Sequence, residues 1–137
     1  MSDRVRDAMI PDPQTLEASA TAQEAGAHLV LPDVRAVYVC DEGRFVGVVT
    51  RKTLVAEVVA AGRDPRETPV GELAEPPNWT IDAELPLDEA FRFLEENDAE
   101  RVPVLEGERL VGVLSRSVLQ RRLAEDVPPP EPDLLEL

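Results

Sequence analysis

Two hydroxyl side chains stand at matching places in two similar segments of the sequence. The segment GVVTRKTL, residues 47–54, returns as GVLSRSVL, residues 112–119. In each copy the hydroxyl, Thr50 or Ser115, follows an apolar run and opens a segment of helical character. A hydroxyl there can cap the helix, which stabilises it by about 1 kcal/mol, or it can help to bind an anion beside the free amides of the first turn. The sequence leaves both roles open.

Basic residues follow both hydroxyls directly. Arg51 and Lys52 come after Thr50, and Arg116 comes after Ser115. These cations either offset a negative ligand locally or lie solvated at the start of a helix. A local source of positive charge matters because the chain carries a net charge of −14.

The bulk charge and composition exclude several classes of function. A net charge of −14 disfavours nucleic acid and anionic membranes, which require clustered Lys and Arg. One cysteine, Cys40, and one histidine, His28, are too few soft ligands for a structural zinc site, and a single cysteine forms no internal disulfide. With no signal-peptide pattern and no apolar run long enough to span a membrane, the sequence predicts a cytoplasmic protein.

Catalytic motifs are absent from the sequence. It contains no Gly-x-Ser-x-Gly elbow, no Walker-type Gly-Lys-Ser/Thr and no His-Glu-x-x-His. Because there is only one histidine, acid–base chemistry would rest on carboxylates, and these are spread over the whole chain. We therefore predict that the protein is not an enzyme.

The matching octapeptides belong to a longer internal duplication. A shift of 65 residues aligns 5–59 with 70–124 without a gap, and sixteen of the 55 pairs are identical. The duplication predicts repeat 1 at 4–62, a linker at 63–69 and repeat 2 at 70–124. The prolines of the acidic tail, 125–137, favour an extended segment, and we expect it to be disordered unless its end docks on a partner.

Each repeat has the same predicted order of elements, β-α-β-β-α, after a short helical lead. The sequence predicts short strands at 14–18 and 79–83, each leading into a helix, and hairpins at 36–50 and 101–115. Further helices follow at 51–62 and 116–126. Thr21 and Glu24 fit a capping box, Pro86 suits the first turn of the second-repeat helix, and Gly62 suits a helix end. The fold class is α/β (α+β), with two repeats packed sheet to sheet in pseudo-twofold symmetry.

The duplicated unit, with its cores VYVCDEGRFVGVVT and VPVLEGERLVGVLS, resembles a tandem pair of cystathionine β-synthase (CBS) domains, also called a Bateman module. The resemblance covers residues 4–124. It implies a regulatory module that binds an adenosine-type ligand (AMP, ADP, ATP or S-adenosylmethionine) between the repeats. It also implies a homodimer, for which we expect helix residues Val55, Val58, Val59, Leu119 and Leu123 to supply apolar surface.

The ligand motif of that family is Gly-h-x-(Thr/Ser)-x-x-(Asp/Asn), with h apolar. Carried over to this chain, it assigns Gly47 and Thr50 in the first repeat and Gly112 and Ser115 in the second. The acid position departs from the motif in both repeats, because Thr53 and Val118 stand there. Threonine keeps one weaker hydrogen bond to a ribose and valine keeps none, so the site organised by Thr50 should fill first.

The resemblance also assigns Arg101, which precedes the strand of the second repeat, as a phosphate contact. Its counterpart in the first repeat is Ala36. Since opposing repeats contribute to each cleft, we expect Arg101 either to serve the site built around Thr50 or to pair with a surface carboxylate.

Two functions follow from these observations. The leading one is a stand-alone module that senses an adenosine-type ligand through Gly47, Thr50, Arg51, Thr53, Arg101, Gly112, Ser115 and Arg116. The alternative is a ligand-free module for dimerisation or protein interaction, which the two missing acids favour. The regulated partner cannot be named from the sequence.

Overall fold

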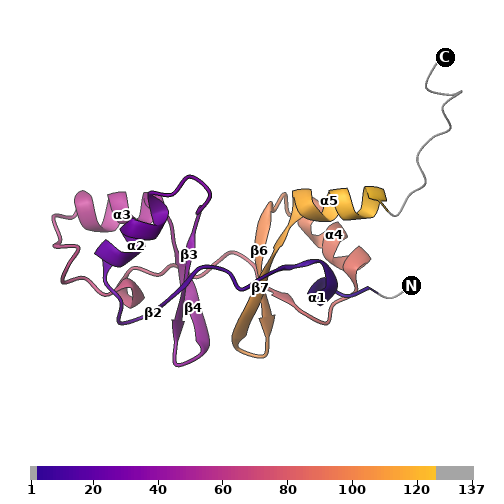
Figure 1. Cartoon of the computed structure of the whole chain (residues 1–137), viewed down its shortest axis with the longest axis horizontal. Helices are drawn as coiled ribbons and strands as arrows, with labels where there is room; N and C mark the ends of the chain where they lie inside the picture. Colours follow the sequence, from indigo (N-terminus) through magenta and orange to yellow (C-terminus); the bar gives the residue numbers. More distant parts are fainter. Residues whose placement is uncertain (1–2, 126–137) are drawn as a thin grey trace, which may run out of the picture.

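The computed structural model describes residues 3–125, and its strands form two sheets. One sheet has four strands in the order β1-β7-β6-β5, and the other has three in the order β2-β3-β4. Figure 1 shows the two sheets next to each other near the middle of the molecule, with α2 and α3 toward one end and α4 and α5 toward the other. Within residues 3–125, no helix combines the length and the apolar character that crossing a membrane requires.

The elements follow the predicted order in both repeats. The first repeat contains α1 (Val5–Ala8), β1 (Ile10–Pro11), β2 (Thr15–Glu17), α2 (Ala22–Leu29), β3 (Val37–Asp41), β4 (Arg44–Val49), α3 (Arg51–Leu54) and the π-helix η1 (Val55–Val59). The second contains the 3₁₀ helix η2 (Val70–Glu72), β5 (Ile81–Asp82), α4 (Leu87–Glu96), β6 (Arg101–Glu106), β7 (Arg109–Ser115) and α5 (Arg116–Glu125). The mixed α/β fold with two sheets is as predicted.

Local sequence signals explain where several of these helices begin and end. The Glu24 amide donates to Thr21 Oγ1 and the Thr21 amide donates to the Glu24 carboxylate, each at 3.2 Å, which confirms the capping box of α2. Gly62 has φ of 72° just after the first-repeat helix, a conformation that suits glycine. Pro86 stands one residue earlier than predicted, at the N-cap of α4 instead of in its first turn. The predicted helix at 51–62 continues from α3 as the π-helix η1.

The leading helices of the two repeats pack on opposite halves of the molecule. Val5 and Ala8 of α1 lie in the core built from the second repeat, whereas Val70 and Leu73 lie in the core built from the first. Backbone hydrogen bonds also join each lead to the other half. The Arg6 amide donates to the Ala83 carbonyl, and the Gly71 amide donates to the Ala18 carbonyl, both at 2.9 Å. The segments that connect the leads to the rest of each repeat therefore cross between the halves.

The burial of apolar residues differs in part from what the sequence suggests. Burial alternates along β4, and Val46 is 41% exposed. Val58 and Leu119, expected to add exposed surface for a dimer, are buried in the two cores. The side chain of Leu123 and the predicted tail beyond residue 125 lie outside the described residues.

Candidate functional site

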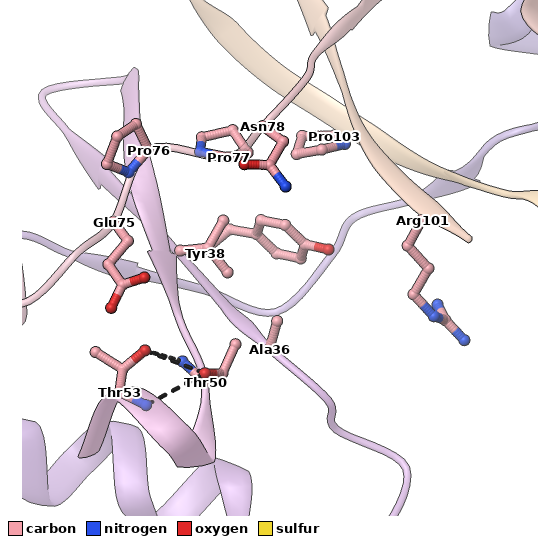
Figure 2. A pocket seen from close by; sticks show the side chains of 11 residues that line it. Ala36, Tyr38, Thr50, Thr53, Glu75, Pro76, Pro77, Asn78, Arg101 and Pro103 are labelled. Carbon is pink, nitrogen blue, oxygen red and sulfur yellow. Dashed lines mark hydrogen bonds between the residues drawn. The ribbon is translucent and has the colours of Figure 1, made fainter. Parts of the chain in front are cut away.

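A pocket of 320 Å³ lies where the end of the first-repeat sheet meets the crossing segment 75–78 and the start of β6. Its lining comes from both repeats: Ala36, Tyr38, Val48, Thr50, Thr53, Glu75, Pro76, Pro77, Asn78, Arg101 and Pro103. Figure 2 shows the pocket, with Thr50 and Thr53 at one end and Arg101 at the other. A volume above about 300 Å³ is in the usual range for small-molecule sites.

The two threonines form a closed hydrogen-bonded pair (Figure 2). The Thr50 amide donates to Thr53 Oγ1 at 3.1 Å, the Thr53 amide donates to Thr50 Oγ1 at 3.3 Å, and the two hydroxyl oxygens lie 3.1 Å apart. One hydroxyl proton is used between the two oxygens, so the pair has one hydroxyl proton left to donate. Capping of α3 and donation to a ligand are therefore compatible roles for this pair.

Thr53 is only 4% exposed, although it lines the pocket. The sequence motif treats its position as a direct contact for a ribose. In the structure its hydroxyl accepts the Thr50 amide and thereby orients Thr50. Its contact with a ligand stays a prediction.

Tyr38 and Arg101 form the other end of the pocket. Tyr38 lies on β3, is almost fully buried, and points its hydroxyl along the pocket in Figure 2. Burial raises the pKa of the Tyr38 phenol, and the nearby Arg101 charge lowers that pKa in part. At neutral pH the phenol is therefore a neutral donor beside a guanidinium, a combination that suits an anionic group.

Gly47 contributes by letting the crossing segment come close. A Cβ atom at Gly47 would lie 2.7 Å from the Glu75 carbonyl oxygen, which is too short for any side chain. The same segment is joined to β4, because the Val48 amide donates to Glu75 at 2.8 Å and the Glu75 amide donates to Val48 at 3.0 Å. The glycine of the motif thus fixes the wall of the pocket that carries Glu75.

A second, smaller pocket of 240 Å³ lies at the pseudo-symmetric place. It shares Ala36, Tyr38 and Arg101 with the first, and adds Ile10, Pro13, Gln14, Asp33, Val34, Arg35 and Val113. Neither Ser115 nor Val118 lines it. Ser115 is 1% exposed, and its hydroxyl lies within hydrogen-bond distance of Ser117 Oγ and the Val118 amide.

Gly112 permits a close approach in the second half. A Cβ atom there would meet Met9 Sδ at 2.5 Å and the Ile10 carbonyl at 2.9 Å. Gly112 and Gly47 thus have the same steric role on the two sheets.

The basic residues that follow the hydroxyls line neither of the two pockets. Arg51 donates to the carbonyls of Leu31 and Val34, both at 2.9 Å, and so binds the chain just after α2. Arg116 lies within ion-pair distance of Asp98 and Glu100, at 3.2 and 3.6 Å. Arg101, from the opposite repeat, is the arginine that lines the pocket of Thr50.

Comparison with known proteins accounts for this duplicated architecture. The family model described as the CBS domain matches residues 5–60 and again residues 70–125. The chain belongs to the CBS-domain family. Two CBS domains in tandem therefore cover nearly all of the described residues.

Curated relatives and solved structures agree with this assignment. Hypoxic response protein 1 of Mycobacterium tuberculosis is 34% identical over 108 residues, which are 78% of this chain and 73% of that protein. The CBS domain-containing protein YhcV of Bacillus subtilis is 26% identical over 111 residues, 81% of this chain and 79% of that protein. The crystal structure of CBSX2 in complex with AMP has a TM-score of 0.71 and 25% identity, covering 90% of this chain and 97% of that one.

A structure of Hypoxic Response Protein I contains two coordinated zinc ions, with a TM-score of 0.73 and 29% identity over 88% of this chain and 98% of that one. Among residues 3–125 of this CBS-domain chain, no group of three or more His, Cys, Asp or Glu side chains is placed to hold a metal ion.

Sequence reasoning missed three polar residues of the pocket, namely Tyr38, Glu75 and Asn78. Glu75 and Asn78 lie in a segment without helical or strand periodicity, so no pattern drew attention to them. A signal was present in the alignment of the repeats, because Pro11 and Pro76 match and mark equivalent crossing segments. Trp79, next to Asn78, instead packs edge-on against Phe93 with 6.2 Å between ring centroids.

Proposed function

We propose that this CBS-domain pair is a regulatory module that binds an adenosine-type ligand, with AMP as the preferred form, in the pocket of Thr50. The observation that carries the proposal is one pocket that combines the hydroxyl pair, the buried Tyr38 phenol and the Arg101 guanidinium. A related structure, that of CBSX2, is a complex with AMP, which supports the same ligand class here.

The physical chemistry of the pocket favours a monophosphate. A phosphate at the Arg101 end can accept charge-assisted hydrogen bonds from the guanidinium, and the pocket is walled by Val48, Pro76 and Pro77 where a base and sugar would lie. Among the residues that the structure describes, Arg101 is the single cation that lines the pocket, and the chain has a net charge of −14. Additional phosphates would therefore add more repulsion than attraction unless a metal ion accompanies them.

Isothermal titration calorimetry with AMP, ADP, ATP and S-adenosylmethionine, without divalent metal, tests the proposal. We expect AMP to bind, and ATP to bind more weakly. Saturation at 100 times the dissociation constant should stabilise the fold by about 2.7 kcal/mol and raise the melting temperature by several degrees. ATP binding tenfold tighter than AMP would show that the net charge does not govern the site.

A second candidate function is a ligand-free interaction module. The observation that favours it is the absence of an acid at both motif positions, which are Thr53 and Val118. In that case none of the four compounds produces heat of binding or a melting shift, and the chain acts through its protein contacts alone.

Both functions are compatible with a homodimer through the helices. Val55 and Val59 of η1 are 58% and 73% exposed, an arrangement that leaves apolar surface uncovered in one chain. Multi-angle light scattering at micromolar concentration should give a mass of twice 15.0 kDa. A single species of 15.0 kDa would exclude the homodimer.

A further inference from the structure

The acid that the motif lacks at Thr53 has a counterpart elsewhere in the pocket. Glu75 lies on the crossing segment and lines the same pocket as Thr50 and Thr53. Figure 2 shows its side chain extending toward the end of the pocket that holds the two threonines, away from Arg101. A carboxylate beside a hydroxyl pair is suited to accept hydrogen bonds from neighbouring hydroxyls of a ligand.

The backbone of Glu75 is held in a defined place. It exchanges two hydrogen bonds with Val48, at 2.8 and 3.0 Å, and it is followed by Pro76 and Pro77, whose rings fix the backbone φ angle. Among ion pairs between residues 3 and 125, none involves the Glu75 carboxylate. The carboxylate is therefore positioned from its main chain and is not engaged by a cation of the described chain.

The two halves differ at the place that Glu75 occupies. The residue at the equivalent place in the first repeat is Ile10, which pairs with Val113 as Glu75 pairs with Val48. Ile10 lines the second pocket, where Ser115 is buried and takes no part in the lining. Among the two pockets compared, the lining of the second contains the Asp33 carboxylate but neither Ser115 nor Val118, so a carboxylate lies together with the hydroxyl of a strand-to-helix junction only in the pocket of Thr50.

We infer that Glu75 replaces the missing motif acid and binds the 2′- and 3′-hydroxyls of the ribose, so that the site selects ribonucleoside monophosphates over 2′-deoxy forms. This inference rests on the proposed function. Glu75 and Arg101 at opposite ends also set the direction of the ligand, because a phosphate beside the Glu75 carboxylate would be repelled. The sugar lies at the threonine end and the phosphate at the arginine end.

The test is calorimetry of AMP and 2′-deoxy-AMP on the whole chain and on two variants. Glu75→Gln removes the carboxylate charge and keeps the shape of the side chain. Glu67→Gln removes an equal charge from an exposed residue of the segment 63–69 that lines neither pocket, and serves as the matched control. Equal melting temperatures of the two variants confirm that both are folded.

The unmodified chain should prefer AMP to 2′-deoxy-AMP by about tenfold, the usual value of one charge-assisted hydrogen bond. Glu75→Gln should lose most of this preference, because AMP loses contacts to both hydroxyls and weakens about tenfold more than 2′-deoxy-AMP, which has only the 3′-hydroxyl contact to lose. Glu67→Gln should keep the full preference.

An unchanged preference in Glu75→Gln would overturn the inference and leave the proposed function intact. Equal tightening of both compounds in that variant would also overturn it, because Glu75 would then act only as a repulsive charge. If neither compound binds to the unmodified chain, the proposed function fails together with the inference.

Discussion

The two halves of this molecule share one scaffold and differ in a few side chains at equivalent places. Thr50 lines a pocket, whereas its counterpart Ser115 is buried by its surroundings. Glu75 on one crossing segment is matched by Ile10 on the other, and Arg101 is matched by Ala36. Duplication therefore builds two similar frameworks, and the polar groups at the pockets decide whether each can hold a polar ligand.

Arg101 is the charged residue among the three that line both pockets, the others being Ala36 and Tyr38. One guanidinium cannot fully neutralise an anion in each pocket at the same time. With the hydroxyl pair on one side only, we expect one nucleotide per chain, in the pocket of Thr50.

The largest expected effect is the loss of fold stability when each of the two equivalent glycines is replaced by alanine. Gly47→Ala should destabilise the fold by about 3 kcal/mol, because the new Cβ would press on the Glu75 backbone, which cannot yield without losing its bonds to Val48. Gly112→Ala should cost less, about 2 kcal/mol, because its shortest contact is the flexible Met9 side chain and its backbone contact, the Ile10 carbonyl at 2.9 Å, is looser than the 2.7 Å contact at Gly47. Urea denaturation measures both, and an equal loss in the two variants would contradict the difference.

The second prediction concerns the positive charge of Arg101, which lines both pockets. Arg101→Ala should weaken AMP by about 2 kcal/mol, roughly thirtyfold, and leave adenosine nearly unchanged, because only the phosphate loses its partner. The control is Arg35→Ala, since Arg35 lines only the second pocket. Calorimetry should find normal AMP binding in Arg35→Ala, and the opposite ranking would move the ligand to the second pocket.

The third prediction separates helix capping from ligand binding. Thr50→Ala and Ser115→Ala should each lose about 1 kcal/mol of stability without ligand, because both remove a capping hydroxyl. Only Thr50→Ala should also lose most of the melting shift produced by AMP. If Ser115→Ala abolishes that shift and Thr50→Ala does not, the assignment of the pocket is wrong.

The smallest effect comes from restoring the motif acid. The family motif alone predicts that Thr53→Asp tightens AMP binding by up to about tenfold. We expect about threefold or less, because Thr53 is nearly buried and Glu75 already brings a carboxylate to the same end of the pocket. In the Glu75→Gln background the same substitution should recover more affinity, and calorimetry of the double variant measures the difference.

Much of the fold could be predicted from the sequence because its signals are local or repeated. The shift of 65 residues gave two copies, and the periodicity within them gave the order of strands and helices. The capping box of Thr21 and Glu24 and the glycine after the first-repeat helix were also readable, since their hydrogen bonds join residues close in the chain.

The candidate site could be predicted only in part. The motif drew attention to the ends of β4 and β7, and Thr50 lines a pocket whereas Ser115 is buried. The layout of the family suggested Arg101 as a partner for that site, and Arg101 lines the same pocket as Thr50. The basic residues next to the hydroxyls looked equally suitable, yet Arg51 binds carbonyl groups after α2 and Arg116 pairs with Asp98 and Glu100. The sequence alone does not show whether such an arginine binds groups of its own chain or a ligand.

The sequence by itself thus determined the duplication, the elements and the hydroxyl at each strand-to-helix junction. Only the tertiary structure decided which hydroxyl faces a pocket, and that Glu75, Tyr38 and Arg101 surround it. The physical reason is that exposure depends on what packs over a residue. At Thr50 this is the crossing segment 75–78 and the start of β6, which the chain brings there from the other half of the fold.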